Sequence, residues 1–150
     1  METKSVVVER TYNAPIQRVW TAITDRDQMR EWYFNLEDFK ADIGFKFQFT
    51  GGDEHVQYLH ECEVLKVEPP RKLVYSWAYP GYQGYSVLTW ELFEEGENNT
   101  LLRLTHDGLE SFPQDNPNFR VESFTNGWNY FVNEALPAFV EKQHGLLQYG

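Results

Sequence analysis

The chain has 150 residues, of which 23 are acidic and 13 basic, and its formal net charge is −10 with histidine neutral. This length fits a single domain over residues 1–150, large enough to bury a core without disulfide bonds. The acidic balance argues against nucleic-acid partners, because affinity for phosphate backbones comes from clustered Lys and Arg, and it argues equally against anionic membrane surfaces. The 11 Phe, 9 Tyr and 5 Trp residues predict an interior dominated by aromatic side chains.

Cysteine usage and hydropathy indicate the compartment. Cys62 is the one cysteine of the sequence, which excludes an intrachain disulfide and favours a reducing compartment, so we expect a cytoplasmic protein. The first ten residues lack the apolar run and the small residues of a secretion signal. The longest uncharged run, Val74–Trp90, is interrupted by Pro80 and two glycines, so it predicts a hairpin and no membrane insertion.

The N-terminal part of the sequence predicts one strand and two short helices. Ser5–Tyr12 is rich in β-branched residues and alternates in polarity, which indicates a strand. After the helix-start signal at Pro15, apolar residues recur at helical spacing as far as Ile23. Asp25, with Gln28 three residues later, resembles a capping box that opens a second short helix.

The segment 37–107 predicts mostly strands. Phe45, Phe47 and Phe49 alternate with polar residues, which is typical of a half-buried strand. Further strands are expected at 58–67, 73–79, 85–93 and 101–106. Short turns containing proline or glycine separate them, so consecutive strands should be antiparallel neighbours.

The C-terminal segment predicts the longest helix, with apolar residues at helical spacing up to Phe139 and an end near His144–Gly145. Pro137 falls inside this helix and lacks an amide hydrogen, so the helix should kink near Asn133. The order of elements predicts an α+β fold in which one amphipathic helix covers the apolar face of a curled antiparallel sheet. The gaps between helix and sheet would be filled either by large side chains or by a ligand.

Motifs spread over nearly the whole chain resemble one known family. In chain order they are Asn13–Pro15, Val19–Trp20, Ala22–Asp25, Trp32, His60–Val64, Glu68–Trp77, Leu104–Gly108, Gly127–Trp128 and Leu136. Their order and spacing are similar to those of the family homologous to the activator of the heat-shock protein 90 ATPase, within the START-like (SRPBCC) superfamily. One segment departs from the pattern: Ala41–Phe45 has one glycine and no arginine where many members carry a basic, glycine-rich strand entry, so no family role is carried over to it.

The resemblance implies a helix-grip fold. In this fold a curved antiparallel sheet of about seven strands wraps around a long C-terminal helix, two short helices follow the first strand, and a cavity lies between sheet and helix. Known relatives include lipid carriers, hormone and allergen-type ligand binders, aromatase or cyclase enzymes and a co-chaperone domain. The fold alone therefore does not fix the function.

The sequence offers few groups for metal binding or catalysis. His60 and Cys62 face the same way on one strand, but His106 would lie three strands away, about 14 Å at about 4.8 Å per strand, so no metal site is expected. No nucleophile elbow, phosphate-binding loop or dinucleotide fingerprint occurs, so no cofactor is expected. Glu61 and Glu63 share a strand face, but carboxylates on a wet face are normally solvated, and no catalytic residue is assigned.

The candidate site centres on Gly127 and Trp128 of the long helix. Glycine costs about 1 kcal/mol relative to alanine within a helix and is tolerated more easily where something approaches that turn closely. Trp128 is either a core residue or a wall of a ligand cleft, and His106 is either an ordinary strand-end residue, a general base or a hydrogen-bond partner of the ligand. The predicted ligand-binding residues are Trp32, Trp77, Tyr79, Tyr85, His106, Phe124, Trp128 and Phe131.

Three functions follow, in order of preference. The first is binding of a small, mostly apolar, aromatic or lipid-like ligand in the cleft between the sheet and the C-terminal helix, without catalysis. The second, implied by the resemblance, is a co-chaperone interaction with heat-shock protein 90 through an acidic surface. That surface comprises Glu91, Glu94, Glu95 and Glu97. The third is a cyclase- or aromatase-like enzyme with His106 or a carboxylate as base, which requires a titratable group of shifted pKa inside the cleft.

Overall fold

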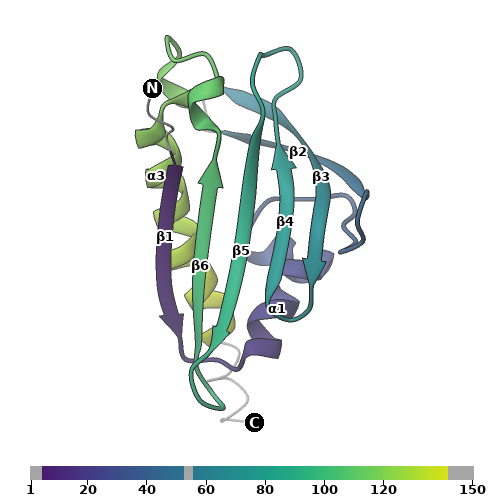
Figure 1. Cartoon of the computed structure of the whole chain (residues 1–150), viewed down its shortest axis with the longest axis vertical. Coiled ribbons are helices and arrows are strands. Elements are labelled where there is room, and N and C mark those ends of the chain that lie inside the picture. Colours follow the sequence, from purple (N-terminus) through teal and green to yellow (C-terminus); the bar gives the residue numbers. More distant parts are fainter. Residues whose placement is uncertain (1–4, 53–55, 142–150) are drawn as a thin grey trace.

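A computed structural model describes residues 5–52 and 56–141 of the chain. Its six strands form one antiparallel sheet in the order β1-β6-β5-β4-β3-β2 (Figure 1). The strands are β1 (Ser5–Tyr12), β2 (Lys46–Gly52), β3 (Gln57–Glu68), β4 (Lys72–Trp77), β5 (Ser86–Glu94) and β6 (Thr100–Asp107). The predicted α+β helix-grip architecture is confirmed, with six strands in the described part of the chain where about seven were expected.

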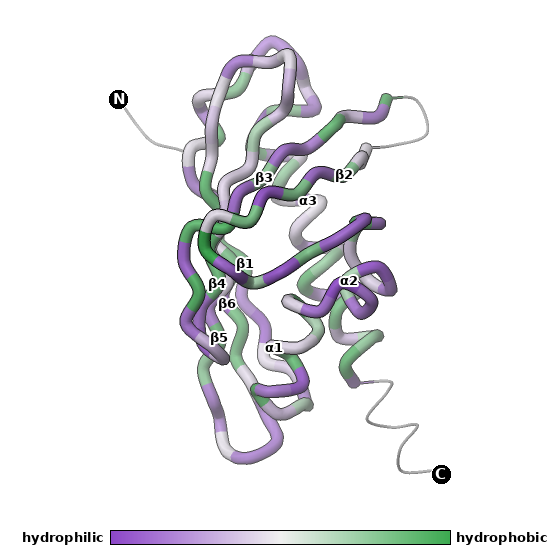
Figure 2. The backbone as a smooth tube through the Cα atoms, turned by 90° about the vertical axis from the view of Figure 1, so that its right-hand side faces the viewer, coloured by the Kyte–Doolittle hydropathy of each residue, from purple (hydrophilic) through white to green (hydrophobic). Residues whose placement is uncertain are grey.

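The helices lie on one side of this sheet. The helical elements are α1 (Ile16–Thr24), α2 (Arg26–Trp32), the 3₁₀ turns η1 (Leu109–Ser111) and η2 (Pro117–Phe119), α3 (Val121–Tyr130) and the π-helical segment η3 (Phe131–Ala135). Viewed from the side, α1, α2 and α3 all lie to the right of β4, β5 and β6 (Figure 2). Alternate side chains of β5, such as Leu88 and Trp90, are buried beneath them, so the sheet has one apolar and one wetter face. None of the helices in the described residues is long and apolar enough to cross a membrane.

The sheet curls at β3, and this curl shapes the site. The N-terminal half of β3 pairs with β2, whereas Val64–Glu68 pairs with β4, and the register shifts between Val64 and Lys66. Such an irregularity bends a strand and increases its twist. The β2–β3 hairpin therefore swings away from the rest of the sheet toward the helix side (Figure 2).

The two short helices begin and pack as the sequence predicts. The Asp25 carboxylate accepts a hydrogen bond from the Gln28 backbone N–H at 3.1 Å, which caps the start of α2. The N-cap of α1 is Pro15, which makes no side-chain hydrogen bond there. Trp32 joins the two helices, because its indole N–H donates to the Ala22 carbonyl oxygen at 2.8 Å.

The C-terminal helix is irregular where the sequence predicts a disturbance. It is α-helical over Val121–Tyr130, π-helical over Phe131–Ala135 and α-helical again over 136–141. Pro137 has no amide hydrogen, so the carbonyl groups four and five residues before it lack their usual helical donor. The predicted helix end at His144–Gly145 lies outside the described residues.

Side chains of β1 satisfy these two carbonyl groups. The Arg10 guanidinium donates to the Asn133 carbonyl oxygen at 3.0 Å, and the Tyr12 hydroxyl donates to the Val132 carbonyl oxygen at 2.6 Å. Tyr12 and Val132 are both fully buried, so no solvent could take the place of the hydroxyl. The first strand thus holds the irregular turn of the last helix.

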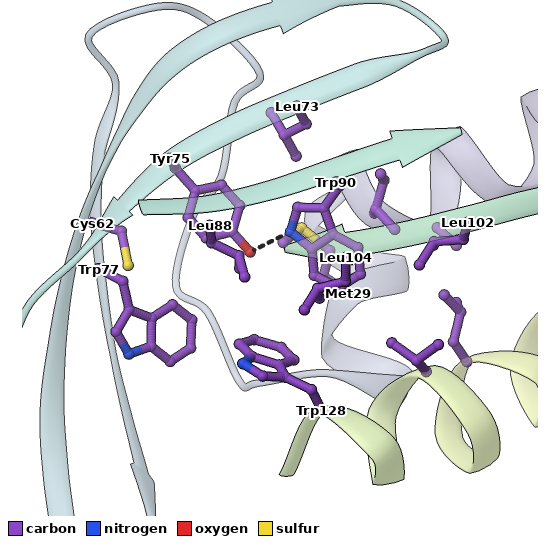
Figure 3. Packing of buried hydrophobic residues seen from close by; sticks show 14 of the residues in the cluster. Met29, Cys62, Leu73, Tyr75, Trp77, Leu88, Trp90, Leu102, Leu104 and Trp128 are labelled. Atoms are coloured by element: carbon purple, nitrogen blue, oxygen red, sulfur yellow. Dashed lines mark hydrogen bonds between the residues drawn. The ribbon is translucent and has the colours of Figure 1, made fainter. Parts of the chain in front are cut away.

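Aromatic side chains, together with aliphatic ones, fill the space between sheet and helices (Figure 3). Trp90 lies at the centre, and its indole N–H donates to the Tyr75 hydroxyl at 3.2 Å. That hydroxyl is 2.8 Å from the hydroxyl of Tyr33. Trp77 of β4 and Trp128 of α3 extend this layer toward the β2–β3 hairpin, with ring centroids 5.3 Å apart. Beyond these two indoles the packing opens.

Candidate functional site

A cavity of about 550 Å³ lies between α3 and the curled β2–β3 hairpin. Ligand-binding pockets commonly measure about 300–1,000 Å³, so this one is large enough for a small organic molecule. Its lining is Phe34, Gly51, Gly52, Val56, Tyr58, His60, Trp77, Tyr79, Asn118, Phe119, Ser123, Phe124, Asn126, Gly127, Trp128, Tyr130 and Phe131. Among the described residues, no Asp, Glu, Lys or Arg contributes to this lining.

Five of the eight residues predicted from the sequence lie in the cavity wall. They are Trp77, Tyr79, Phe124, Trp128 and Phe131. The other three lie elsewhere: Trp32 is buried against Phe131 with ring centroids 6.1 Å apart, and His106 is fully buried against Trp77 and Trp128. Tyr85 is 56% exposed and lies just before β5, outside the cavity.

His106 lies behind the cavity wall and hydrogen-bonds to Trp128. The Trp128 indole N–H donates to His106 Nδ1 at 3.0 Å, which assigns the imidazole proton to Nε2, 2.8 Å from Ser86 Oγ. The Ser86 hydroxyl in turn donates to the Trp77 carbonyl oxygen at 2.8 Å. Burial lowers the pKa of His106 to about 3, so the ring stays neutral and Nδ1 remains an acceptor. Both ring nitrogens are engaged, so His106 positions Trp128 and has none left for a ligand or for proton abstraction.

His60 lies in the cavity wall itself. Its Nδ1 is 3.0 Å from the Tyr58 carbonyl oxygen, and its ring stacks on Phe49 with centroids 4.6 Å apart and planes 15° apart. Burial lowers the pKa of His60 to about 4, and backbone hydrogen bonding at Tyr58 and Phe49 opposes part of this shift. The imidazole is therefore neutral at physiological pH.

In the part of the chain that the structure describes, the exposed lining of the cavity includes polar, uncharged side chains. The Tyr58 hydroxyl accepts hydrogen bonds from the side-chain amides of Asn116 and Asn118 at 3.2 and 3.0 Å, which leaves its own hydrogen available for donation. Ser123 and Asn126 of α3 line the same cavity. A molecule entering the cavity would meet hydrogen-bonding groups first and aromatic rings behind them.

Two glycines shape opposite walls. A Cβ atom on Gly127 would meet no atom within 4 Å, so the packing of the protein does not require glycine there and the helix leaves open space beside Trp128. A Cβ atom on Gly51 would lie 2.7 Å from Phe34 Cε1 and 3.2 Å from His60 Cε1. Glycine at position 51 thus allows the Phe34 and His60 rings to pack against β2.

Sequence reasoning did not place Phe34, Tyr58 or His60 in a ligand site. Tyr58 and His60 precede Cys62 at a spacing of two on one strand, so the alternation that puts His60 and Cys62 on one face also includes Tyr58. Phe34 lies between α2 and β2, in a segment with no periodic pattern, and only the three-dimensional structure brings it to the cavity.

Metal ligands do not assemble in the part of the chain that the structure describes. No three His, Cys, Asp or Glu side chains cluster there in a way that could hold an ion. His60 and His106 both contact the Trp77 ring, with centroid distances of 5.0 and 5.3 Å. Cys62 is buried on the same strand as His60.

The acidic residues considered for a chaperone contact have partners on the sheet surface. Glu91 is 3.8 Å from both Lys72 and Arg103, and Glu94 is 3.3 Å from Arg71. The neighbouring Glu95 accepts a hydrogen bond from Thr11 at 3.0 Å, and Glu97 is exposed. Basic side chains therefore balance part of this surface.

Solved structures share the fold over most of the chain. MLL2253 from Mesorhizobium loti is 29% identical with a TM-score of 0.75, and the match covers 93% of this chain and 98% of that one. CalU16 from Micromonospora echinospora is 28% identical with a TM-score of 0.72, covering 93% and 75%. DynU16, a protein in the dynemicin biosynthetic locus, is 25% identical with a TM-score of 0.74, and the match covers 91% of this chain and 47% of DynU16.

The comparison with family models identifies the family. Residues 13–141 match the model described as activator of Hsp90 ATPase homolog 1-like protein, as the sequence motifs predicted. A comparison with curated protein sequences gave no match. The chain belongs to the family of activator of Hsp90 ATPase homolog 1-like proteins, within the START-like superfamily.

Proposed function

We propose that this domain binds a small, uncharged, mostly aromatic or lipid-like molecule in the cavity between α3 and the β2–β3 hairpin. The observation that carries the proposal is a cavity of about 550 Å³ whose deep wall is aromatic and whose lining, in the described residues, holds no charged side chain. Burying a charged ligand group there without a partner would be costly, whereas apolar surface gains by leaving water. The buried, unpaired thiol of Cys62 suits a reducing cytoplasm, where we expect the domain to work.

An enzyme of the cyclase or aromatase kind is the second candidate. Two observations favour it: the cavity wall holds a titratable group of shifted pKa, His60, and the similar protein DynU16 lies in a biosynthetic locus. A general base works best when its pKa is near the operating pH. With a pKa of about 4, His60 is a weak base at pH 7, so we rank binding above catalysis.

A contact with heat-shock protein 90 is the further alternative that the family description raises. The acidic surface expected to carry it is partly neutralised by Lys72, Arg71 and Arg103. We therefore place ligand binding first. Stimulation of the chaperone ATPase by this domain at low salt would favour the alternative.

The binding proposal is tested by blocking the cavity. Gly127→Leu adds a side chain at a position where a Cβ atom has open space beside Trp128, and leucine favours a helix more than glycine does, so the variant should fold. Asn129→Leu introduces the same leucine side chain at an exposed position of the same helix that does not line the cavity.

We expect the fluorescent probe Nile red to bind the natural protein and the Asn129→Leu variant equally, and to bind the Gly127→Leu variant at least tenfold more weakly. Native mass spectrometry and displacement of the dye by a panel of aromatic compounds and lipids would then identify ligand classes. Equal dye binding by all three proteins, with no panel member displacing the dye, would contradict the proposal.

A further inference from the structure

We propose that His60 is the polar recognition group of the cavity: its Nε2 accepts a hydrogen bond from a hydroxyl group of an uncharged, hydroxylated aromatic ligand. The inference rests on the proposed function and specifies the chemical class of the ligand. Four observations on the position, protonation and surroundings of His60 support it.

The first observation fixes the tautomer. His60 Nδ1 lies 3.0 Å from the Tyr58 carbonyl oxygen, and a carbonyl oxygen can only accept a hydrogen bond. Nδ1 must therefore carry the imidazole hydrogen and donate it. In a neutral ring the other nitrogen, Nε2, is then a bare acceptor.

The second observation concerns what Nε2 touches. Among the described residues, Nδ1 is the ring atom with a hydrogen bond of ordinary geometry, to Tyr58, and the Phe49 backbone also interacts with the ring. Nε2 belongs to a side chain that is 6% exposed and that lines the cavity. Because His60 lines the cavity, this acceptor is available to a molecule inside it.

The third observation is the rigidity of the imidazole. Phe49 stacks on one face, and the edges of Trp77 and Tyr79 approach with centroid distances of 5.0 and 4.8 Å. Gly51 has no side chain, so His60 Cε1 can pack against β2 there. A side chain confined in this way loses little freedom when it binds, which favours recognition by a single hydrogen bond.

The fourth observation selects the ligand chemistry. Burial keeps the pKa of His60 near 4, so the ring offers a lone pair and no positive charge at neutral pH. No cation in the described lining would balance a carboxylate, and no carboxylate would balance an amine. The rings of Phe34, Trp77, Trp128 and Phe131 offer aromatic contact surfaces. A flat aromatic compound with a phenolic hydroxyl satisfies all of these conditions.

Three compounds that share one ring system test the inference: 1-hydroxypyrene, 1-methoxypyrene and 1-pyrenecarboxylic acid, titrated at pH 6.5 with their own fluorescence as the readout. We expect the hydroxyl compound to bind the natural protein at least tenfold more tightly than the methoxy compound, because only the hydroxyl can donate to Nε2. The carboxylate should bind most weakly.

The matched variants are His60→Phe and Leu59→Phe. His60→Phe keeps a flat ring but removes the acceptor, so it should bind the hydroxyl and methoxy compounds equally. Leu59 is 43% exposed on the opposite face of β3, and Leu59→Phe should keep the full preference for the hydroxyl.

The outcomes separate the inference from the proposed function. Nile red binding that Gly127→Leu blocks, together with equal affinity of the natural protein for the hydroxyl and methoxy compounds, would overturn the role of His60 and leave the binding function standing. If the natural protein binds neither Nile red nor the pyrene compounds, both the inference and the proposed function are overturned. Independently of any variant, nitrogen-15 NMR of the free protein should show the hydrogen of His60 on Nδ1, and a hydrogen on Nε2 would refute the inference.

Discussion

The hydrogen bond from Tyr12 to the π-helical turn gives a sharp quantitative prediction. Tyr12→Phe removes one hydroxyl and leaves the ring in place, so the packing of β1 is preserved. The Val132 carbonyl oxygen then loses its donor at a position that is fully buried. Pro137 cannot replace the donor, because it has no amide hydrogen.

The expected cost follows from the burial of that carbonyl group. Leaving a buried backbone acceptor unsatisfied costs about 1–3 kcal/mol, so we expect the free energy of unfolding to fall by about 2 kcal/mol. For a chain of this length, about 2–4 °C of melting temperature corresponds to 1 kcal/mol, which predicts a melting temperature about 4–8 °C lower. Urea unfolding followed by tryptophan fluorescence measures the free energy directly.

A second substitution isolates the cause. Pro137→Ala restores an amide hydrogen that can donate four or five residues back, to the carbonyl group of Asn133 or Val132. In that background Tyr12→Phe should cost at least about 1 kcal/mol less than in the natural protein, which a double-mutant cycle detects as coupling. A cost below about 0.5 kcal/mol in the natural background, or no coupling with Pro137→Ala, would refute the reasoning.

Four further outcomes are expected. Burial holds the pKa of His106 near 3 and that of His60 near 4, below the ordinary value of 6.5, so both rings are neutral in the folded protein. The contribution of the neutral rings to the free energy of unfolding is therefore fully present above about pH 6.5. Between pH 6.5 and the folded pKa values, each histidine lowers the free energy of unfolding by up to about 1.4 kcal/mol per pH unit. Urea unfolding at pH 7 and pH 5 measures this loss, and His60→Phe should reduce it by about half, whereas an unchanged free energy at pH 5 would contradict it. Gly127→Leu should raise the free energy of unfolding of the free protein by about 0.5–1 kcal/mol, seen as a higher urea midpoint, and a lower midpoint would show that position 127 is not open. Ser86→Ala leaves the His106 Nε2 hydrogen without its acceptor and should cost about 1–3 kcal/mol with a change in tryptophan fluorescence, which a neutral result would disprove. Glu91→Gln weakens two partly exposed ion pairs and should lower the free energy of unfolding by less than about 1 kcal/mol in the same assay. A larger loss would show that these ion pairs stabilise the fold.

The sheet and its inner face were predictable because the alternation of side chains is a local property. Phe47 and Phe49, expected on the buried face of a strand, are 5% and 4% exposed in β2. The same rule explains the misplacement of Tyr85: burial of Leu88 and Trp90 puts the even positions of β5 inward, so position 85 faces outward.

The cavity itself was predictable only in part, because it depends on how far the sheet curls. Strand spacing placed His60 and His106 three strands apart, and the strand order agrees. The register shift in β3 then carries His60 toward α3, so that it lines the same cavity as Trp128. Neither the shift nor the approach of Phe34 has a local pattern that a single sequence displays. The irregular turn before Pro137 does have a local signal in the sequence, because proline lacks an amide hydrogen whatever its surroundings.

The attachment of the last helix to the first strand also has a consequence for how the protein is made. The bonds from Tyr12 and Arg10 to the turn that carries Phe131 join residues 120 and 123 positions apart. Contacts of such long range form late, because the loop between them must close before they can form. On the ribosome, β1 can pair with β6 before these two bonds form, and the turn that carries Phe131 is fastened to β1 only after synthesis has passed Asn133.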